Sequence, residues 1–294
     1  MTLTDQGKLA IAEIVFYIPA GLLALYDCFK HGFGRSLAWV YIIVLSILRI
    51  AGSAITIYTE NASDPSTTLV TTGIILASVG LSPLLNALVF MLKRVNEGMQ
   101  NRRLPPILFR ILEIVNIVAV VLVAYGGSKA NTPSNSQDDK KTGLDMEKAG
   151  IIVFLITFFV TAAAALVTFT FIRNAIPGER RLVYFGIASL PFLFVRLVYS
   201  TIVIFENNQS TVFSMLDPNI WAESFMETLE EFIVVLLYLA AGLITPTIAR
   251  DQVQGRTGSN APWPSGPKYD EEHQLNNYNN VNPAYAPLPP TSRS

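Results

Sequence analysis

Charged side chains inside long apolar runs are the residues of this sequence whose types and positions could do chemistry. Four glutamates of the run 221–245 fall within one arc of about 100° if the run is helical; they are Glu223, Glu227, Glu230 and Glu231. Arg49 and Arg196 lie at matching depth in two other runs, and Glu13 lies somewhat shallower in a third. Because a charge facing lipid is costly, we expect these side chains to face the interior of a helix bundle.

The predicted charged layer comprises Glu13, Arg49, Arg196, Glu227, Glu230 and Glu231. Its carboxylates outnumber its guanidinium groups, so either some glutamates bind protons or a cation or cationic ligand balances the charge. The structural alternative is a buried ion network that only fixes the register of the helices. Residues equally far from one surface lie level in antiparallel helices, so we predict that Arg196 pairs with Glu227 or Glu231.

A second polar cluster is predicted toward the other side of the membrane. Arg110, Glu113 and Asn116 recur at i, i+3 and i+6, which places them on one helix face. Asn86 of the preceding run lies level with Glu113. The expected role of Asn86, Glu113 and Asn116 is hydrogen bonding between helices.

The residues needed for several other chemistries are missing. The two histidines, His31 and His273, are too few for a seven-helix membrane zinc hydrolase. The run 221–245 has no lysine for a retinal Schiff base, and the chain has no GxSxG, GxGxxG or Walker motif. We therefore expect no enzyme, no metal and no cofactor. The net charge of −1 gives no basic field for nucleic acid.

Seven apolar runs must position the charged layer. The chain has 294 residues, of which 51% are hydrophobic and 15% charged, whereas a soluble domain is nearer 25% charged. Runs of about 20 residues are long enough to cross a bilayer, and in lipid they must be helical. The predicted fold is all-α, with a seven-helix transmembrane domain over residues 1–248 and spans at 8–29, 37–58, 68–92, 107–126, 149–172, 182–205 and 221–245.

Basic residues in the loops predict the orientation of these helices. Loops 30–36, 93–106 and 173–181 share one side and carry nine Lys and Arg, against five on the other side. The N-terminus is therefore expected outside and the C-terminus in the cytosol. The glycosylation candidates Asn61 and Asn208 both fall in loops predicted to lie outside. Cys28, the sole cysteine, is expected at the cytosolic end of the first span, where it is a candidate for S-acylation.

Residues 249–294 differ in composition from the rest of the chain. They are rich in Pro, Asn and Ser and have no apolar period, so a disordered cytosolic tail is expected. The tail contains an NPxY string at 282–285 and a short polyproline stretch at 287–290. Either is a candidate contact for a cytosolic adaptor, and a plain solvated tail is the alternative.

Three strings in the helices resemble an uncharacterised family of fungal seven-helix membrane proteins, known as a domain of unknown function. They are SILRIAGS at 46–53, LPFLFVRLVYS at 190–200 and METLEE at 226–231. More loosely, the layout is similar to fungal lipid-translocating-exporter-like proteins. The resemblance implies the topology and a fungal source, and it implies no activity.

Three functions remain open at this point. The charged layer could be the pocket of a receptor-like protein that senses a small molecule or lipid, with membrane lipid as a partner. It could instead be the relay of a proton- or cation-coupled transporter or lipid exporter, or a purely structural network in an accessory protein. The expected location is the plasma membrane or an endomembrane.

Overall fold

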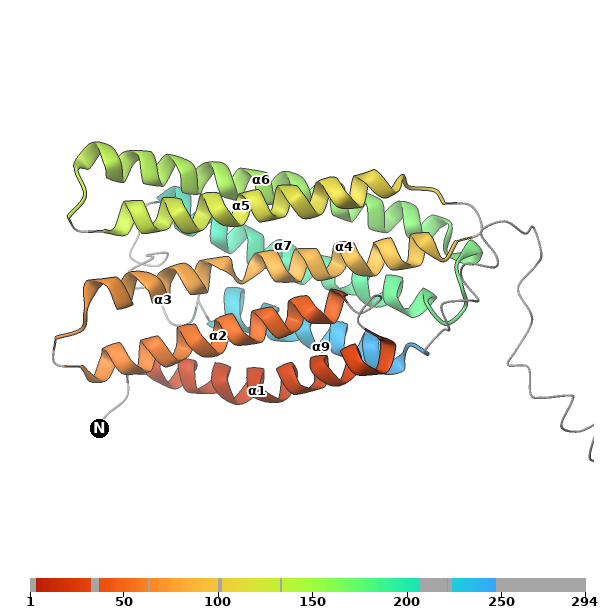
Figure 1. The fold of residues 1–294 in the computed structure, drawn as a ribbon, viewed down its shortest axis with the longest axis horizontal. Coiled ribbons are helices and arrows are strands. Elements are labelled where there is room, and N and C mark those ends of the chain that lie inside the picture. Colours follow the sequence, from red (N-terminus) through yellow and green to blue (C-terminus); the bar gives the residue numbers. More distant parts are fainter. Residues whose placement is uncertain are drawn as a thin grey trace, which may run out of the picture. The chain divides into compact units, whose positions relative to one another are not determined.

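The structure is a computed structural model that describes residues 4–32, 37–62, 64–99, 102–132, 134–206, 221 and 224–246. Within these ranges every regular element is a helix (Figure 1). In chain order they are α1 (Asp5–His31), α2 (Leu37–Asn61), α3 (Thr67–Val79), α4 (Leu81–Glu97), α5 (Pro106–Asn131), α6 (Gln137–Thr170), the short η2 (Ile172–Asn174), α7 (Arg180–Glu206), the π-helical η3 (Ser224–Thr228) and α9 (Leu229–Ile244). The chain divides into two units, Met1–Gly258 and Ser259–Ser294.

Five of these helices are long and apolar enough to cross a membrane, namely α1, α2, α5, α6 and α7. The other two predicted spans are not single α-helices. The run 68–92 is divided at Gly80 into α3 and α4, three residues before Pro83, which has no N–H to donate and whose ring crowds the preceding turn. The run 221–245 is a π-helical turn followed by the 16-residue α9.

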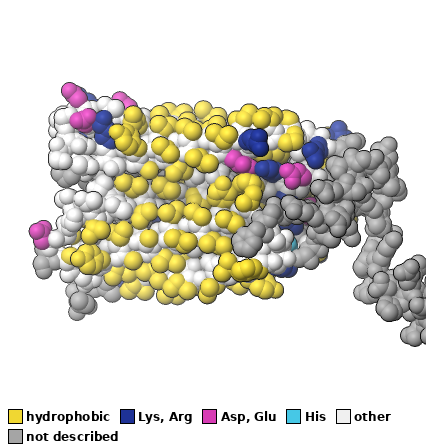
Figure 2. Space-filling view, viewed as in Figure 1, with side chains coloured by type: hydrophobic (Ala, Val, Ile, Leu, Met, Phe, Trp, Pro, Cys, Tyr) yellow, Lys and Arg dark blue, Asp and Glu magenta, His cyan; other side chains and the backbone are white. Residues whose placement is uncertain are grey.

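The core of the first unit is built around α4. Most of its side chains, from Leu81 to Asn96, are buried, and it contacts α2, α5, α6 and α7. The surrounding helices turn large apolar side chains outward, among them Val15 and Leu22 of α1 and Val121 of α5. Figure 2 shows hydrophobic side chains over much of the visible face, with most of the charged groups toward its two ends. A water-soluble protein rarely exposes so large an apolar surface, so this arrangement is that of a membrane protein.

Helices α5 and α6 form a long hairpin that corrects one sequence-based boundary. The loop expected at 127–148 is mostly helical, because α5 continues to Asn131 and α6 begins at Gln137. Ser136 caps α6 by accepting a hydrogen bond from the backbone N–H of Asp139. Three glycines let the two helices touch, since a Cβ on Gly126, Gly143 or Gly150 would lie 2.6 Å from an atom of the opposite helix.

Candidate functional site

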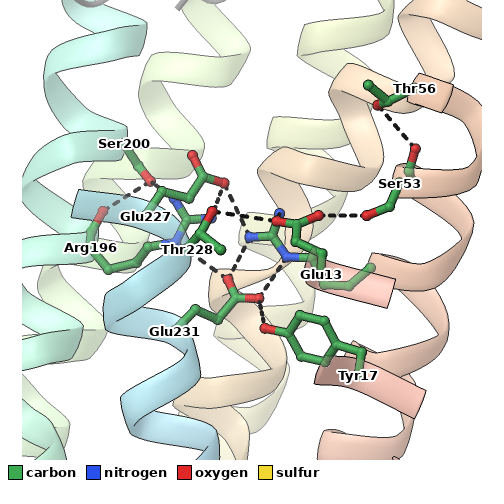
Figure 3. Close-up of polar contacts among 11 residues, drawn as sticks. Glu13, Tyr17, Ser53, Thr56, Arg196, Ser200, Glu227, Thr228 and Glu231 are labelled. Carbon is green, nitrogen blue, oxygen red and sulfur yellow. Dashed lines mark hydrogen bonds and ion pairs between the residues drawn. The ribbon is translucent and has the colours of Figure 1, made fainter. Parts of the chain in front are cut away.

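Arg49 of α2 is the centre of a buried ion network. Its Nε donates to Glu231 Oε1 at 2.6 Å, and its Nη2 donates to Glu231 Oε2 at 2.5 Å, so the pair is bidentate. The same Nη2 donates to Glu227 Oε1 at 3.1 Å. We use the term ion network for Glu13, Arg49, Arg196, Glu227 and Glu231, which come from α1, α2, α7, η3 and α9 (Figure 3).

Arg196 of α7 closes the network on its other side. Its Nη2 lies 2.8 Å from Glu227 Oε1, and its Nε lies 3.6 Å from Glu231 Oε2. The prediction that Arg196 pairs with Glu227 or Glu231 is therefore confirmed. These contacts are ion pairs without hydrogen-bond geometry, because neither Nε nor Nη2 has a hydrogen-bond partner among the described residues. Arg196 thus keeps two buried donors that this part of the chain does not satisfy.

Glu13 of α1 is held differently from the other two carboxylates. Its Oε2 accepts a hydrogen bond from Ser53 at 2.5 Å, and its Oε1 accepts one from Thr228 at 3.4 Å. Its ion pair is longer than the shortest ion pairs of the other two carboxylates, because Glu13 Oε1 lies 3.6 Å from Arg49 Nη1. Hydroxyl groups can donate to a carboxylate in either protonation state, so this setting does not require Glu13 to be ionised.

Besides the two hydroxyl groups on Glu13, the sequence reasoning missed two further members of this site. The hydroxyl group of Tyr17 donates to Glu231 Oε1 at 2.5 Å, and Tyr17 is fully buried. It lies four residues after Glu13 and so on the same face of α1, a spacing that could have identified it. Gly80 is the second: a Cβ there would lie 3.0 Å from Arg49 Nη2 and 3.2 Å from Glu231 Oε2. The backbone at the α3–α4 break therefore packs directly on the bidentate pair.

Glu230 does not join the network, which corrects the predicted acidic stripe. Its Oε2 has no hydrogen-bond partner within the described ranges, and no ion pair joins it to a described arginine. The physical reason is the π-helical winding of η3, which has more residues per turn and aligns Glu227 with Glu231 rather than with Glu230. Glu223, the fourth glutamate of that stripe, lies outside the described residues.

The second predicted polar cluster is present in part. Asn116 Nδ2 donates to Asn86 Oδ1 at 2.9 Å, and both amides are buried between α4 and α5. Glu113 lies apart from this pair and bonds Lys93 Nζ at 3.1 Å instead. Lys93 has a long flexible stem and follows Asn86 by two turns of α4, so it reaches the next turn of α5.

The far end of α9 is held by basic residues. Lys30 Nζ donates to the carbonyl oxygens of Gly242 and Leu243, at 3.2 and 2.6 Å. Arg181 Nη1 donates to the carbonyl oxygen of Ile244 at 2.6 Å. Cations at a helix C-terminus satisfy its last carbonyls and interact favourably with the helix dipole. Both ends of the η3–α9 segment are therefore fixed by charge.

The modification candidates fall in less favourable places. Asn61 is the last residue of α2, and its Nδ2 donates to the carbonyl oxygen of Ile57 at 2.8 Å. Cys28 is fully buried in this structure, and its S-acylation stays a prediction. Asn208 and the two tail motifs lie outside the described residues.

The described residues contain no group of three or more His, Cys, Asp or Glu side chains arranged to hold a metal ion. The family model of a domain of unknown function (DUF7702) matches residues 3–247, a range that contains the complete ion network. No curated protein and no solved structure matches the chain.

Proposed function

The chain belongs to the family of the domain of unknown function DUF7702, and we propose that it is a receptor-like membrane protein that senses a cationic small molecule or lipid headgroup at Glu13. The observation that carries this proposal is the charge of the ion network. Its three carboxylates, on Glu13, Glu227 and Glu231, face two guanidinium groups. One negative charge is left without an equivalent partner when all five groups are ionised.

The contacts indicate which carboxylate is left over. Arg49 is committed to Glu231 by two hydrogen bonds, and Arg196 lies closest to Glu227. Glu13 has no ion pair closer than 3.6 Å, whereas Glu231 and Glu227 have contacts of 2.5 and 2.8 Å, and Glu13 depends on two hydroxyl groups. A buried negative charge without full compensation is costly, so Glu13 favours the uptake of a proton or a positively charged group.

A path for a signal supports sensing. Cation binding at Glu13 would weaken its attraction for Arg49 and so shift the balance of charge around Glu227 and Glu231. Those two glutamates begin the η3–α9 segment, whose other end is held by Lys30 and Arg181. A change at the network would therefore reach the opposite end of the helix through one rigid element.

A second candidate function uses the same excess charge. A proton- or cation-coupled transporter or lipid exporter would load and release its coupling ion at Glu13. A purely structural network is the third candidate, because buried ion pairs can fix helix register without any ligand. The three proposals differ in whether a cation binds and whether it crosses the membrane.

The proposed topology has seven crossings. Residues 67–97 and 224–244 would each cross as an interrupted helix, since at 1.5 Å per residue they are about 45 Å and about 31 Å long. The N-terminus would lie outside and the C-terminal tail in the cytosol, available to an adaptor. We further propose a fungal source, a plasma-membrane or endomembrane location and no enzymatic activity.

Thermal unfolding of the purified full-length protein tests the sensing proposal. The unfolding temperature is measured while Na⁺, K⁺, choline and tetramethylammonium chlorides replace one another at fixed total salt and pH. Sensing predicts that one of these cations raises the unfolding temperature in a saturable way, because a ligand that binds only the folded state stabilises it. Glu13→Gln should abolish the effect, and Glu230→Gln, a matched change outside the network, should leave it intact.

Flux into liposomes separates the remaining proposals. A transporter predicts proton or cation uptake that Glu13→Gln abolishes, whereas a receptor predicts saturable binding without uptake. A structural network predicts that no cation changes the unfolding temperature and that Glu13→Gln alone stabilises the protein. That last result would overturn a ligand role for Glu13.

A further inference from the structure

Four arginines at the end of the molecule where α5 begins have no ionic partner within the described residues. They form what we call the arginine rim, which consists of Arg102, Arg103, Arg110 and Arg173, all exposed. No described carboxylate lies within ion-pair distance of any of them. This is unusual for that end, because the other Lys and Arg side chains that the structure describes there are engaged: Lys93 with Glu113, Arg94 with Glu179, and Lys30, Arg180 and Arg181 with backbone carbonyls.

The rim lies at the boundary of the apolar surface. Arg110 shares the outward face of α5 with Ile107 and Ile114, which are three and four residues away, and with the adjacent Ile111; each of the three is at least half exposed. Figure 2 shows Lys and Arg side chains at this edge of the apolar surface. A guanidinium group one turn into a lipid-facing helix reaches the headgroup region while its stem stays among acyl chains.

Arg103, a second arginine of the rim, contacts the end of α6. The guanidinium carbon of Arg103 lies 4.3 Å from the centre of the Phe171 ring, at the end of α6. The ring is partly exposed, so it supports the guanidinium group from one side and leaves the other side open. Arg173 follows Phe171 by two residues.

We propose that the arginine rim binds the phosphate of an anionic phospholipid, whose acyl chains lie along the isoleucine face of α5. Guanidinium groups bind phosphate oxygens in a bidentate manner, and the adjoining apolar face suits a lipid rather than free phosphate. At the opposite end of the molecule, Lys8 pairs with Asp5 and Lys129 with Asp139, so part of the positive charge there is neutralised, and no described arginine lies there. The cluster of unpaired guanidinium groups beside an apolar face therefore favours one leaflet and one class of lipid.

Native mass spectrometry of the purified full-length protein tests this proposal. Phosphatidylglycerol and phosphatidylcholine with identical acyl chains are titrated, and bound lipid is counted. The wild-type protein should prefer phosphatidylglycerol. At about 1 kcal/mol for each basic residue near the headgroups, Arg103→Ala with Arg110→Ala should lower that preference roughly 10- to 30-fold. The matched control Lys140→Ala with Lys141→Ala removes two positive charges from the opposite end and should keep it.

Two further measurements make the result decisive. Arg103→Lys with Arg110→Lys keeps the charge and should retain only part of the preference, because ammonium groups do not bind phosphate in a bidentate manner. Millimolar inorganic phosphate should not displace the lipid. Equal binding of the two lipids, an equal loss in the lysine control, or displacement by inorganic phosphate would each overturn the proposal. Size-exclusion profiles of all variants, all changed at exposed or partly exposed positions, establish that they are folded.

Discussion

Replacing Arg49 by methionine should destabilise the protein more than any other single change in the ion network. Methionine keeps most of the volume and removes the charge. The change deletes two hydrogen bonds to Glu231 and one to Glu227, all shorter than 3.2 Å and all buried or partly buried. Three carboxylates would then face Arg196 alone. Removing one partner of a buried ion pair costs about 3–5 kcal/mol, mainly because the remaining charge is left unpaired.

This free energy can be measured as a shift in unfolding temperature. For a domain of 150–250 residues, each kcal/mol corresponds to about 2–4 °C, so Arg49→Met should lower the unfolding temperature by roughly 6–20 °C. The measurement follows the loss of the monodisperse size-exclusion peak after heating in mild detergent. A loss below about 1 kcal/mol would show that the network contributes little to the stability of the fold.

Second substitutions test the cause. Adding Glu231→Gln to Arg49→Met removes the carboxylate that Arg49 held and restores the charge balance of the wild-type network, so part of the loss should be recovered. Adding Glu230→Gln also removes one carboxylate from the same helix, but outside the network, and should recover nothing. If the two double variants behave alike, net charge rather than this pairing explains the loss, and our reasoning about the geometry is refuted.

Three further predictions follow from other contacts. Gly80→Ala should cost about 1–2 kcal/mol of stability by pressing a methyl group on the bidentate pair, whereas Gly52→Ala, whose Cβ would lie 3.5 Å from the nearest atom, should be neutral or stabilising; equal unfolding temperatures would contradict this. Gly143→Ala should cost at least about 2 kcal/mol, because its Cβ would lie 2.6 Å from the backbone nitrogen of Ala130, and Gly127→Ala should be milder, since it meets only a flexible carboxylate at 3.3 Å. A reporter fused after Ser294 should be cytosolic, and its glycosylation in the lumen would reverse the proposed orientation.

The ion network is the part of the site that the sequence predicts best. Charges in apolar runs must find partners, and counting residues from the helix ends is enough to place Arg196 and Glu227 level with each other. The same reasoning included Glu230, because a regular α-helix puts it about 60° from Glu227 and about 100° from Glu231, at the edge of the same arc. The π-helical turn changes the angles between these glutamates, and the residue types in 224–228 do not predict such a turn.

Boundaries were predicted less well than the network, for identifiable reasons. The hydropathy pattern identifies only the apolar part of α6, from Ala149 onward, whereas the helix begins at Gln137. Its first turns are polar, yet Ser136 and Asp139 supply a capping pattern that could have revealed the start. The position of the break at Gly80 was harder to predict. Pro83 predicts a kink, but the break lies three residues earlier, at Gly80, which packs against Arg49.

The two interrupted helices meet at the same place, and this favours a binding role over a purely structural one. Gly80, at the break between α3 and α4, packs on the pair of Arg49 and Glu231, and η3 supplies Glu227. A network that only fixed register could be built from side chains on regular helices, as the pair of Asn86 and Asn116 is. Departures from regular helix weaken the backbone hydrogen-bond pattern and recur at functional sites. Both departures coincide with the ion network, whose three carboxylates face two guanidinium groups, and this coincidence favours a binding role for the network.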